Sequence, residues 1–327
     1  MEKKPKVLVT GSSGFVGGHL VRDLLRRGYD VSCLLRPSSP AGALAGLPVT
    51  RVRGSYSDPE SLRRAVAGMD YVFHCGAVLN ALRRQDYFKT NSEGTANILH
   101  ACLQANPGLR KFVYVSSIAA AGPAFDKVPL RESAPCRPIS AYGESKYQAE
   151  QAAAAFFGRL PIVIVRAANV LGVGQKELHD ALKMMRLRIV PVIGRREKQA
   201  SVCFVQDLVR ALVLAAEADR AIGKTYFVVA PEFYSWREIT AQLLKEMDIR
   251  RVLRVPHPVL QVLAVIYEAM ARLTGTVPMI SREALDLSRN YYWLYDAGLI
   301  RAELGFTTEV DFVQGIRDIV SHFKARA

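Results

Sequence analysis

Short runs of consecutive apolar residues recur along the first half of the chain, and amphipathic or polar stretches separate them. Strands that are buried on both faces carry such unbroken runs, whereas helices that cover a sheet carry apolar residues three to four positions apart. The pattern predicts strands at 6–10, 31–35, 71–74, 112–116 and 162–166, and helices at 19–27, 59–67, 95–104 and 142–156. This alternation predicts an α/β fold with a doubly wound parallel sheet.

The rhythm changes after about residue 172. The pattern there predicts strands at 201–205 and 225–229, and helices at 207–218, 235–247, 259–273, 281–287 and 310–324. We therefore expect a doubly wound domain over residues 1–171. Residues 172–327 are expected to form mainly a smaller cap over the carboxyl edge of the sheet, with some segments returning to the first domain.

A glycine-rich turn, Thr10-Gly-Ser-Ser-Gly-Phe-Val-Gly17, directly follows the first predicted strand. Gly11 permits a tight turn, Gly14 lets a pyrophosphate approach the backbone, and Gly17 lets the following helix pack closely on the strand. The start of that helix adds free N–H groups and a partial positive charge. An ordinary turn between a strand and a helix is the alternative, but this context predicts a dinucleotide site.

The end of the second predicted strand bears on the choice of dinucleotide. An acidic residue at this place would hold the adenosine ribose of NAD. The chain has Leu35-Arg36-Pro37 instead. A guanidinium pairs with a 2′-phosphate and stacks on adenine, so we expect NADP(H) to be preferred, with NAD(H) as the alternative. A solvated surface arginine is the competing interpretation of Arg36.

Two side chains with acid–base chemistry, Tyr142 and Lys146, lie four positions apart on one predicted helix, so they share a face. An ammonium favours a nearby phenolate, and we expect Lys146 to lower the pKa of Tyr142 so that it exchanges a proton with an alcohol or carbonyl. Ser116 and Ser117 end a strand at the edge where such sheets bind ligands. We assign Ser117 to the substrate oxygen and Ser116 to its support, although the sequence also allows the reverse.

Together these motifs resemble the extended short-chain dehydrogenases/reductases, also called the NAD-dependent epimerase/dehydratase family, over nearly the whole chain. The resemblance rests on residues 10–17, 72–77, 91–97, 116–117, 142–146, 166–172 and 204–207. It implies a Rossmann domain over residues 1–171 with a bound nicotinamide dinucleotide, and a substrate-binding cap formed mainly by residues 172–327. It also implies that Ser117, Tyr142 and Lys146 act together at a carbonyl or alcohol, with Lys146 also holding the nicotinamide ribose.

The same resemblance assigns further residues to the cofactor. Those expected along the pyrophosphate are Ser13, Phe15 and Val16, those expected at the adenine are Ser55 and Tyr56, and those expected behind the cofactor or near its nicotinamide are Cys75, Gly76, Ala77, Asn91, Ala167 and Ala168. The family often has an aspartate where this chain has Ser55, so the adenine contact departs from the family pattern. Members often dimerise through two helices, for which 95–104 and 142–156 are the candidates, and we expect a homodimer.

Two branches of the family are candidates. Residues 35–36 resemble dihydroflavonol reductases, and residues 116–123 and 277–283 resemble proteins related to 3β-hydroxysteroid dehydrogenase. We therefore expect an NADP(H)-dependent oxidoreductase that interconverts a secondary alcohol and a ketone on a hydrophobic substrate, which is steroid-like, flavonoid-like or long-chain. Asn169 matches an asparagine that contacts the diphosphate in nucleotide-sugar epimerases. An epimerase or dehydratase with a retained cofactor is therefore the alternative, and a non-catalytic redox sensor or partner-stabilising member is a third hypothesis.

Composition narrows the remaining choices. The chain has 327 residues, a net charge of +14 and five scattered cysteines, which favour neither a disulfide framework nor a metal site and fit a reducing cytoplasm. Basic residues are spread out and no nucleic-acid motif accompanies them, so we expect a small-molecule substrate and no nucleic acid. No apolar stretch is long enough for a transmembrane helix. The apolar helix at 259–273 is expected to pack as core, to line a substrate pocket or to touch a membrane surface.

Overall fold

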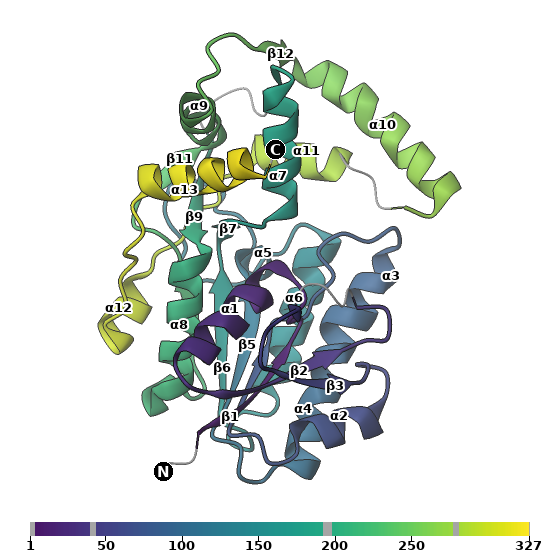
Figure 1. Ribbon diagram of the computed structural model, residues 1–327, viewed down its shortest axis with the longest axis vertical. Coiled ribbons are helices and arrows are strands. Elements are labelled where there is room, and N and C mark those ends of the chain that lie inside the picture. Colours follow the sequence, from purple (N-terminus) through teal and green to yellow (C-terminus); the bar gives the residue numbers. More distant parts are fainter. Residues whose placement is uncertain (1–3, 40–43, 192–197, 277–280, 327) are drawn as a thin grey trace.

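The computed structural model describes residues 4–39, 44–191, 198–276 and 281–326. Seven parallel strands form its central sheet in the order β10-β6-β5-β4-β1-β2-β3 (Figure 1). They are β1 (Lys6–Thr10), β2 (Asp30–Leu35), β3 (Thr50–Arg53), β4 (Tyr71–His74), β5 (Lys111–Ser117), β6 (Ile162–Ala167) and β10 (Thr225–Val228). The strand order reverses between β1 and β4, which is where such sheets bind ligands. The predicted doubly wound parallel sheet is confirmed.

Helices cover both faces of this sheet. Successive side chains of a strand point to opposite faces, so Val7 and Val9 of β1 belong to one apolar cluster and Leu8 to another. The helices α1 (Phe15–Arg26) and α8 (Val205–Glu217) pack together over the first cluster. The second cluster lies under α2 (Pro59–Val66), α4 (Gly94–Ala105) and α6 (Ala141–Ala154). Both α8 and β10 come from the second half of the chain and complete the layers of the first.

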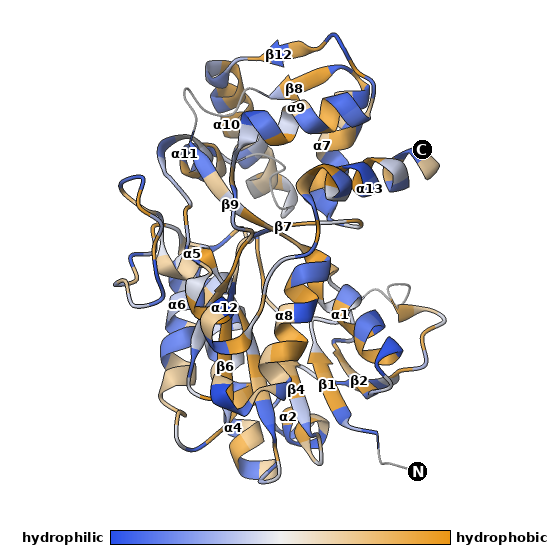
Figure 2. Cartoon of the chain, turned by 90° about the vertical axis from the view of Figure 1, so that its left-hand side faces the viewer, coloured by the Kyte–Doolittle hydropathy of each residue, from blue (hydrophilic) through white to orange (hydrophobic). Residues whose placement is uncertain are grey.

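A second layer stands over the carboxyl edge of the sheet (Figures 1 and 2). It holds a three-stranded sheet in the order β11-β9-β7 and a two-stranded sheet of β12 and β8. Its strands are β7 (Asn169–Leu171), β8 (Ile189–Pro191), β9 (Gln199–Phe204), β11 (Phe233–Ser235) and β12 (Leu253–Val255). Its helices are α7 (Lys176–Arg186), α9 (Trp236–Glu246), α10 (His257–Thr274), α11 (Arg282–Asn290) and α13 (Phe312–Ala325). Apolar residues of α7, α9 and α13 form a separate core for this layer.

Short elements connect these layers. They are α3 (Arg84–Tyr87), a π-helix (Phe88–Glu93), α5 (Ile118–Ala121), a 3₁₀-helix (Asp219–Ala221) and α12 (Gly298–Leu304). Neither these elements nor β3, α7 and the short strands β7, β8, β11 and β12 were among the elements expected from the sequence. Tertiary contacts stabilise such short elements, which have little periodicity of their own. In the segment 277–283, which carries part of the resemblance, residues 277–280 lie outside the described residues.

The apolar helix expected at 259–273 is α10. One side packs against α11, with Leu260 and Ala264 buried beside Leu285. Its other side is exposed, including Val262 at 61% and Leu273 at 88%. Among the described residues, no helix combines the length and the apolar character needed to cross a membrane. Contact of α10 with a membrane surface stays a prediction.

Candidate active site

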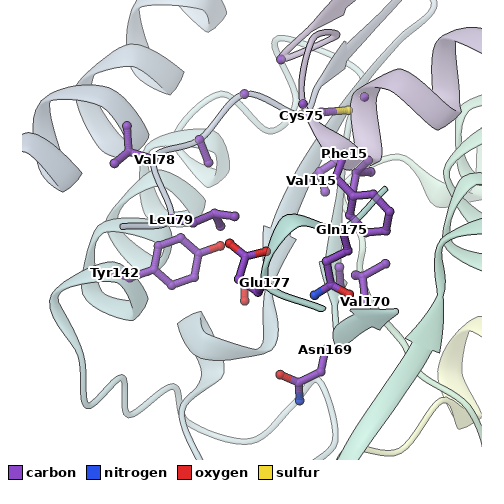
Figure 3. Close-up of a pocket in the computed structure, with 18 of the residues that line it drawn as sticks. Phe15, Cys75, Val78, Leu79, Val115, Tyr142, Asn169, Val170, Gln175 and Glu177 are labelled. Atoms are coloured by element: carbon purple, nitrogen blue, oxygen red, sulfur yellow. The ribbon is translucent and has the colours of Figure 1, made fainter. Parts of the chain in front are cut away.

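A cavity of about 730 Å³ lies where the central sheet meets the C-terminal layer (Figure 3). Its described walls bring together all but one of the residues that the sequence assigned to the site. Those on the walls are Gly11, Ser13, Gly14, Phe15, Val16, Gly17, Arg36, Ser55, Tyr56, Cys75, Gly76, Ala77, Ser117, Tyr142, Lys146, Ala167, Ala168 and Asn169. The exception is Asn91. Residues from seven separate parts of the chain therefore meet in one place, although their individual roles stay predictions.

The turn after β1 is shaped to let a ligand reach the backbone. Gly11 has φ of +66°, and a Cβ there would lie 2.6 Å from Gly76 Cα. A Cβ on Gly17 would lie 2.2 Å from Gly11 O, so α1 can approach the turn only with glycine at this position. No side chain caps α1, and its first turn holds no acidic residue. The free N–H groups and the helix dipole there fit the pyrophosphate of a dinucleotide.

The far end of the cavity follows the end of β2. Arg36 is exposed there, and its backbone N–H donates to Ser39 Oγ at 3.0 Å. Both residues line the cavity, and among its described lining residues the single acid is Glu177, which belongs to α7. A guanidinium and a hydroxyl without a carboxylate form a donor set that suits a 2′-phosphate. The structure therefore holds residues that fit an adenosine 2′-phosphate at this end.

The expected adenine contacts lie along the same wall. The Ser55 hydroxyl is 3.0 Å from Ser57 Oγ, in a short network beside the cavity. Tyr56 packs edge-on against His74 with ring centroids 5.2 Å apart. Burial lowers the pKa of His74 to about 3. Its two nitrogens lie within hydrogen-bond distance of the Thr10 and Thr95 hydroxyls, so this histidine is a neutral structural residue.

The two serines at the end of β5 are separated by their partners. Ser116 also lines the cavity, but its Oγ donates to the buried Glu150 Oε1 at 2.5 Å. Ser117 Oγ accepts from the N–H of Ala119 at 3.1 Å, and the Ser117 side chain acts to lower the pKa of Tyr142. Tyr142 and Lys146 stand one turn apart on α6, and both line the cavity. The geometry thus places Ser117, rather than Ser116, beside the phenol.

The pKa values of Tyr142 and Lys146 differ from the sequence expectation. Burial raises the pKa of Tyr142 to about 12, partly opposed by its hydrogen bond with Ser117. Burial also lowers the pKa of Lys146 to about 7, opposed by the charge of Glu150. Lys146 Nζ donates to Val115 O at 2.8 Å and lies 4.2 Å from the ring centroid of Tyr114. The prediction that Lys146 lowers the pKa of Tyr142 is wrong here, because burial dominates and the ammonium faces Val115.

A buried ion pair supports the floor of the site. Arg166 Nη2 lies 2.7 Å from Glu150 Oε2, and both side chains are only 6% exposed. Arg166 Nη2 also contacts Cys136 Sγ at 3.0 Å. Because Glu150 accepts from Ser116 as well, the pair fixes the end of β5 from below. Buried carboxylates and guanidiniums are stable only when they are paired in this way.

The expected position of Asn91 at the cofactor is corrected, because this residue lies behind the cavity wall. It is 1% exposed and does not line the cavity. Its Oδ1 accepts from Val78 N at 2.7 Å, and its Nδ2 donates to Ser145 Oγ at 2.9 Å. Val78 does line the cavity. Asn91 therefore positions the loop after β4 against α6, next to Lys146, rather than facing a ligand.

The remaining wall was missed by the sequence analysis. Two helix faces of the C-terminal layer supply it, namely Leu178, Ala181 and Met185 of α7 and Trp236, Ile239, Thr240 and Leu243 of α9. Their spacings of three, four and seven residues are those of one helical face. The helical pattern Leu178, Leu182 and Met185 was the signal available at 176–186. Gln175, Glu177 and Asn169 add polar groups to this part (Figure 3).

Asn169 is tied by its own side chain. Its Nδ2 donates to Ser201 O at 3.1 Å, across the paired strands β7 and β9. Glu177 projects from the first turn of α7 and lines the same cavity. Glu177 and Asn169 thus add a carboxylate and an amide to the lining of the cavity.

Comparisons with known proteins agree with this geometry. The model of the NAD dependent epimerase/dehydratase family matches residues 7–230. A 2-alkyl-3-oxoalkanoate reductase of Stenotrophomonas maltophilia is 30% identical over 95% of this chain and 97% of its own. A 3-beta-hydroxysteroid dehydrogenase of Mycolicibacterium neoaurum is 32% identical over 68% of this chain and 65% of its own. The solved UDP-glucose 4-epimerase of Thermotoga maritima shares the fold, with a TM-score of 0.81, 23% identity and coverage of 98% of this chain and 99% of its own.

The family model covers well over half of the chain, and the reductase covers nearly all of it. The glycine turn, the serine at the end of β5 and the tyrosine and lysine of α6 meet in one cavity. The chain belongs to the NAD-dependent epimerase/dehydratase family, the extended short-chain dehydrogenases/reductases.

Proposed function

We propose that this protein is an NADP(H)-dependent reductase that converts a hydrophobic ketone to a secondary alcohol. The observation that carries the proposal is the continuity of the main cavity. It runs from the glycine turn and Arg36, past Tyr142 and Ser117, to the apolar faces of α7 and α9. A site that reduced small polar sugars would not need these two apolar faces.

The protonated state of Tyr142 fits the role of proton donor in the reduction. With a pKa of about 12, its phenol stays protonated at neutral pH and can donate that proton to a carbonyl oxygen. Ser117 would donate a second hydrogen bond to the same oxygen and share its developing charge. A bound nicotinamide dinucleotide would supply the hydride to the carbonyl carbon. The carbonyl thus gains one hydride at carbon and one proton at oxygen, which gives the alcohol.

The other residues of the site would hold the cofactor. The first turn of α1 would bind the pyrophosphate and Arg36 the 2′-phosphate. Lys146 would hold the nicotinamide ribose, and the Glu150–Arg166 pair would keep the end of β5 in place. Two relatives support the substrate class, since one is named as a reductase of 2-alkyl-3-oxoalkanoates and the other as a dehydrogenase of 3β-hydroxysteroids.

Epimerisation or dehydration of a nucleotide-sugar is the second candidate, because Asn169 lines the cavity and the fold is shared with a UDP-glucose 4-epimerase. Two observations make it weaker. The amide of Asn169 already donates to Ser201, and the apolar faces of α7 and α9 line the same cavity. A homodimer through α4 and α6 is compatible with either candidate and stays a prediction.

Loss of nicotinamide absorbance tests the proposal. We expect the purified protein to oxidise NADPH in the presence of long-chain ketones, with one alcohol formed for each NADPH consumed. UDP-glucose and dTDP-glucose are the matched alternatives, because an epimerase would convert them without net cofactor oxidation. Sugar conversion without any ketone turnover would reject the reductase.

A further inference from the structure

A second cavity of about 300 Å³ opens beside the first. The two share Leu79, Ser117, Tyr142, Ala168, Asn169 and Trp236 on their walls. The second cavity then continues toward α11 and the loop after β4. Its volume is at the lower end of the roughly 300–1,000 Å³ typical of small-molecule sites. It is therefore large enough for more than a methyl group, and it meets the first cavity at the phenol that we propose as the proton donor.

The walls of the second cavity differ in chemistry from the α7–α9 wall. Trp293 and Leu287 give it an apolar side. Asn80 and Glu283 give it polar groups, and Glu283 is exposed in the first turn of α11. The α11 N-cap, Ser281, is already occupied, because its Oγ accepts from Ala284 N at 3.2 Å. An amide and a carboxylate beside an apolar surface suit a neutral group that donates hydrogen bonds and has an apolar body.

A ketone carbon has two carbon substituents, which point away from the oxygen on opposite sides. With the oxygen at Tyr142 and Ser117, one substituent can enter the α7–α9 part and the other the α11 part. A methyl ketone would fill the first part and leave the second empty, which loses the apolar burial that the second offers. The fork at Tyr142 is thus matched to a ketone whose two sides are both larger than methyl.

We propose that the substrate is a ketone with two sizeable substituents, a linear apolar chain held between α7 and α9 and a second group, bearing a hydroxyl or amide donor, held against α11. This inference rests on the proposed ketone reduction and specifies its substrate class. Glu283 is a specificity-determining residue in this proposal, because its carboxylate accepts the hydrogen bond from the second group. It takes no part in the proton transfer at Tyr142.

Two isomeric ketones separate the two parts of the site. They are 2-undecanone, which has a methyl group on one side, and 6-undecanone, which has a pentyl group on both. Their carbon counts are equal, so bulk hydrophobicity does not distinguish them. We expect kcat/KM to be about tenfold higher for 6-undecanone, since methylene groups in a fitted pocket change it by such factors. Equal values, or a preference for 2-undecanone, would overturn the inference while leaving ketone reduction in place.

Variants that fill one part each provide the second arm of the test. Ala284→Trp fills the α11 part and should lower kcat/KM about tenfold for 6-undecanone while changing it less than about twofold for 2-undecanone. Ala181→Trp fills the α7–α9 part and should lower both. Ala302→Trp, on an exposed site of α12 that lines neither cavity, is the control. If Ala284→Trp is unstable, Ala284→Leu gives the same comparison. Equal losses on both ketones with Ala284→Trp would contradict the two-part site.

The polar preference is tested with 1-hydroxy-6-undecanone. We expect the wild type to prefer it over 6-undecanone about tenfold, and Glu283→Leu to abolish this preference while Glu283→Gln, which retains an acceptor, keeps most of it. If neither variant alters the preference, Glu283 does not receive the second group. If the wild type reduces none of the three ketones, the proposed function itself fails, and this inference falls with it.

Discussion

On the side of the central sheet, the glycines at 11, 14 and 17 form a backbone wall of the cavity, whereas on the side of the C-terminal layer the wall consists of side chains from α7 and α9. The first wall tolerates few residue types, since an added Cβ on Gly17 would lie 2.2 Å from a carbonyl oxygen. The second wall requires only apolar side chains at helical spacing. The family can therefore keep its cofactor chemistry fixed and change its substrate by exchanging side chains on one layer.

The largest expected effect is at the point where the two walls meet. Tyr142→Phe removes the proton donor and should lower kcat by roughly a thousandfold, because a positioned general acid contributes factors of about 10²–10⁴. Cofactor affinity, measured by NADPH fluorescence, should stay within about twofold. Tyr147→Phe is the matched control, since Tyr147 lies on the same helix and lines neither cavity. Unchanged turnover in Tyr142→Phe would reject the mechanism.

The backbone wall should be intolerant of even one added carbon. Gly17→Ala places a Cβ against Gly11 O and should weaken NADPH binding by at least about tenfold through displacement of the turn. Gly108→Ala is the control, because a Cβ there has no neighbour within 4 Å and the residue has ordinary φ. Calorimetric titration of NADPH gives the dissociation constants. Equal binding by Gly17→Ala would show that the tight turn is not needed for the cofactor.

The far end of the backbone wall should discriminate between cofactors by charge. Arg36→Ala removes the guanidinium expected on the 2′-phosphate and should weaken NADPH binding about tenfold to a hundredfold, as expected for a charge-assisted hydrogen bond. NADH binding should change little. Arg53→Ala, on neighbouring β3 but outside the cavity walls, serves as the control. Tighter NADH than NADPH binding by the wild type would refute the cofactor assignment.

A smaller effect concerns the stability of the sheet side at acid pH. The folded pKa of His74 is about 3 against an ordinary 6.5, so between these values the unfolded chain binds the extra proton. The contribution of neutral His74 to the free energy of unfolding is fully present above about pH 6.5. It falls by about 1.4 kcal/mol for each pH unit below that value. Urea unfolding measures the free energy of unfolding at about pH 7 and pH 5. Between these two pH values it should decrease more in the wild type than in His74→Gln. Parallel pH dependences would show that His74 titrates normally in the folded protein.

Local patterns determined the sheet side of the molecule. Unbroken apolar runs, the three glycines and the four-residue spacing of Tyr142 and Lys146 each depend on neighbours in sequence, and the strands, turn and helix face follow from them. The same patterns did not predict helix α7, because residues 176–186 are only partly apolar. The apolar face of this helix forms a cavity wall only together with α9.

Only the tertiary structure decided the rest. Distant segments bury Tyr142 and Lys146 and so set their pKa values. Glu150 and Arg166 are brought beneath β5, which separates Ser116 from Ser117, and Ser145 and Val78 draw Asn91 behind the wall. Desolvation and hydrogen-bond pairing depend on which residues surround a group in space, and these neighbours lie tens of residues away in the chain. The sequence by itself determined that a dinucleotide turn and a tyrosine–lysine pair exist, and the packing of the second layer on the sheet decided what their site can hold.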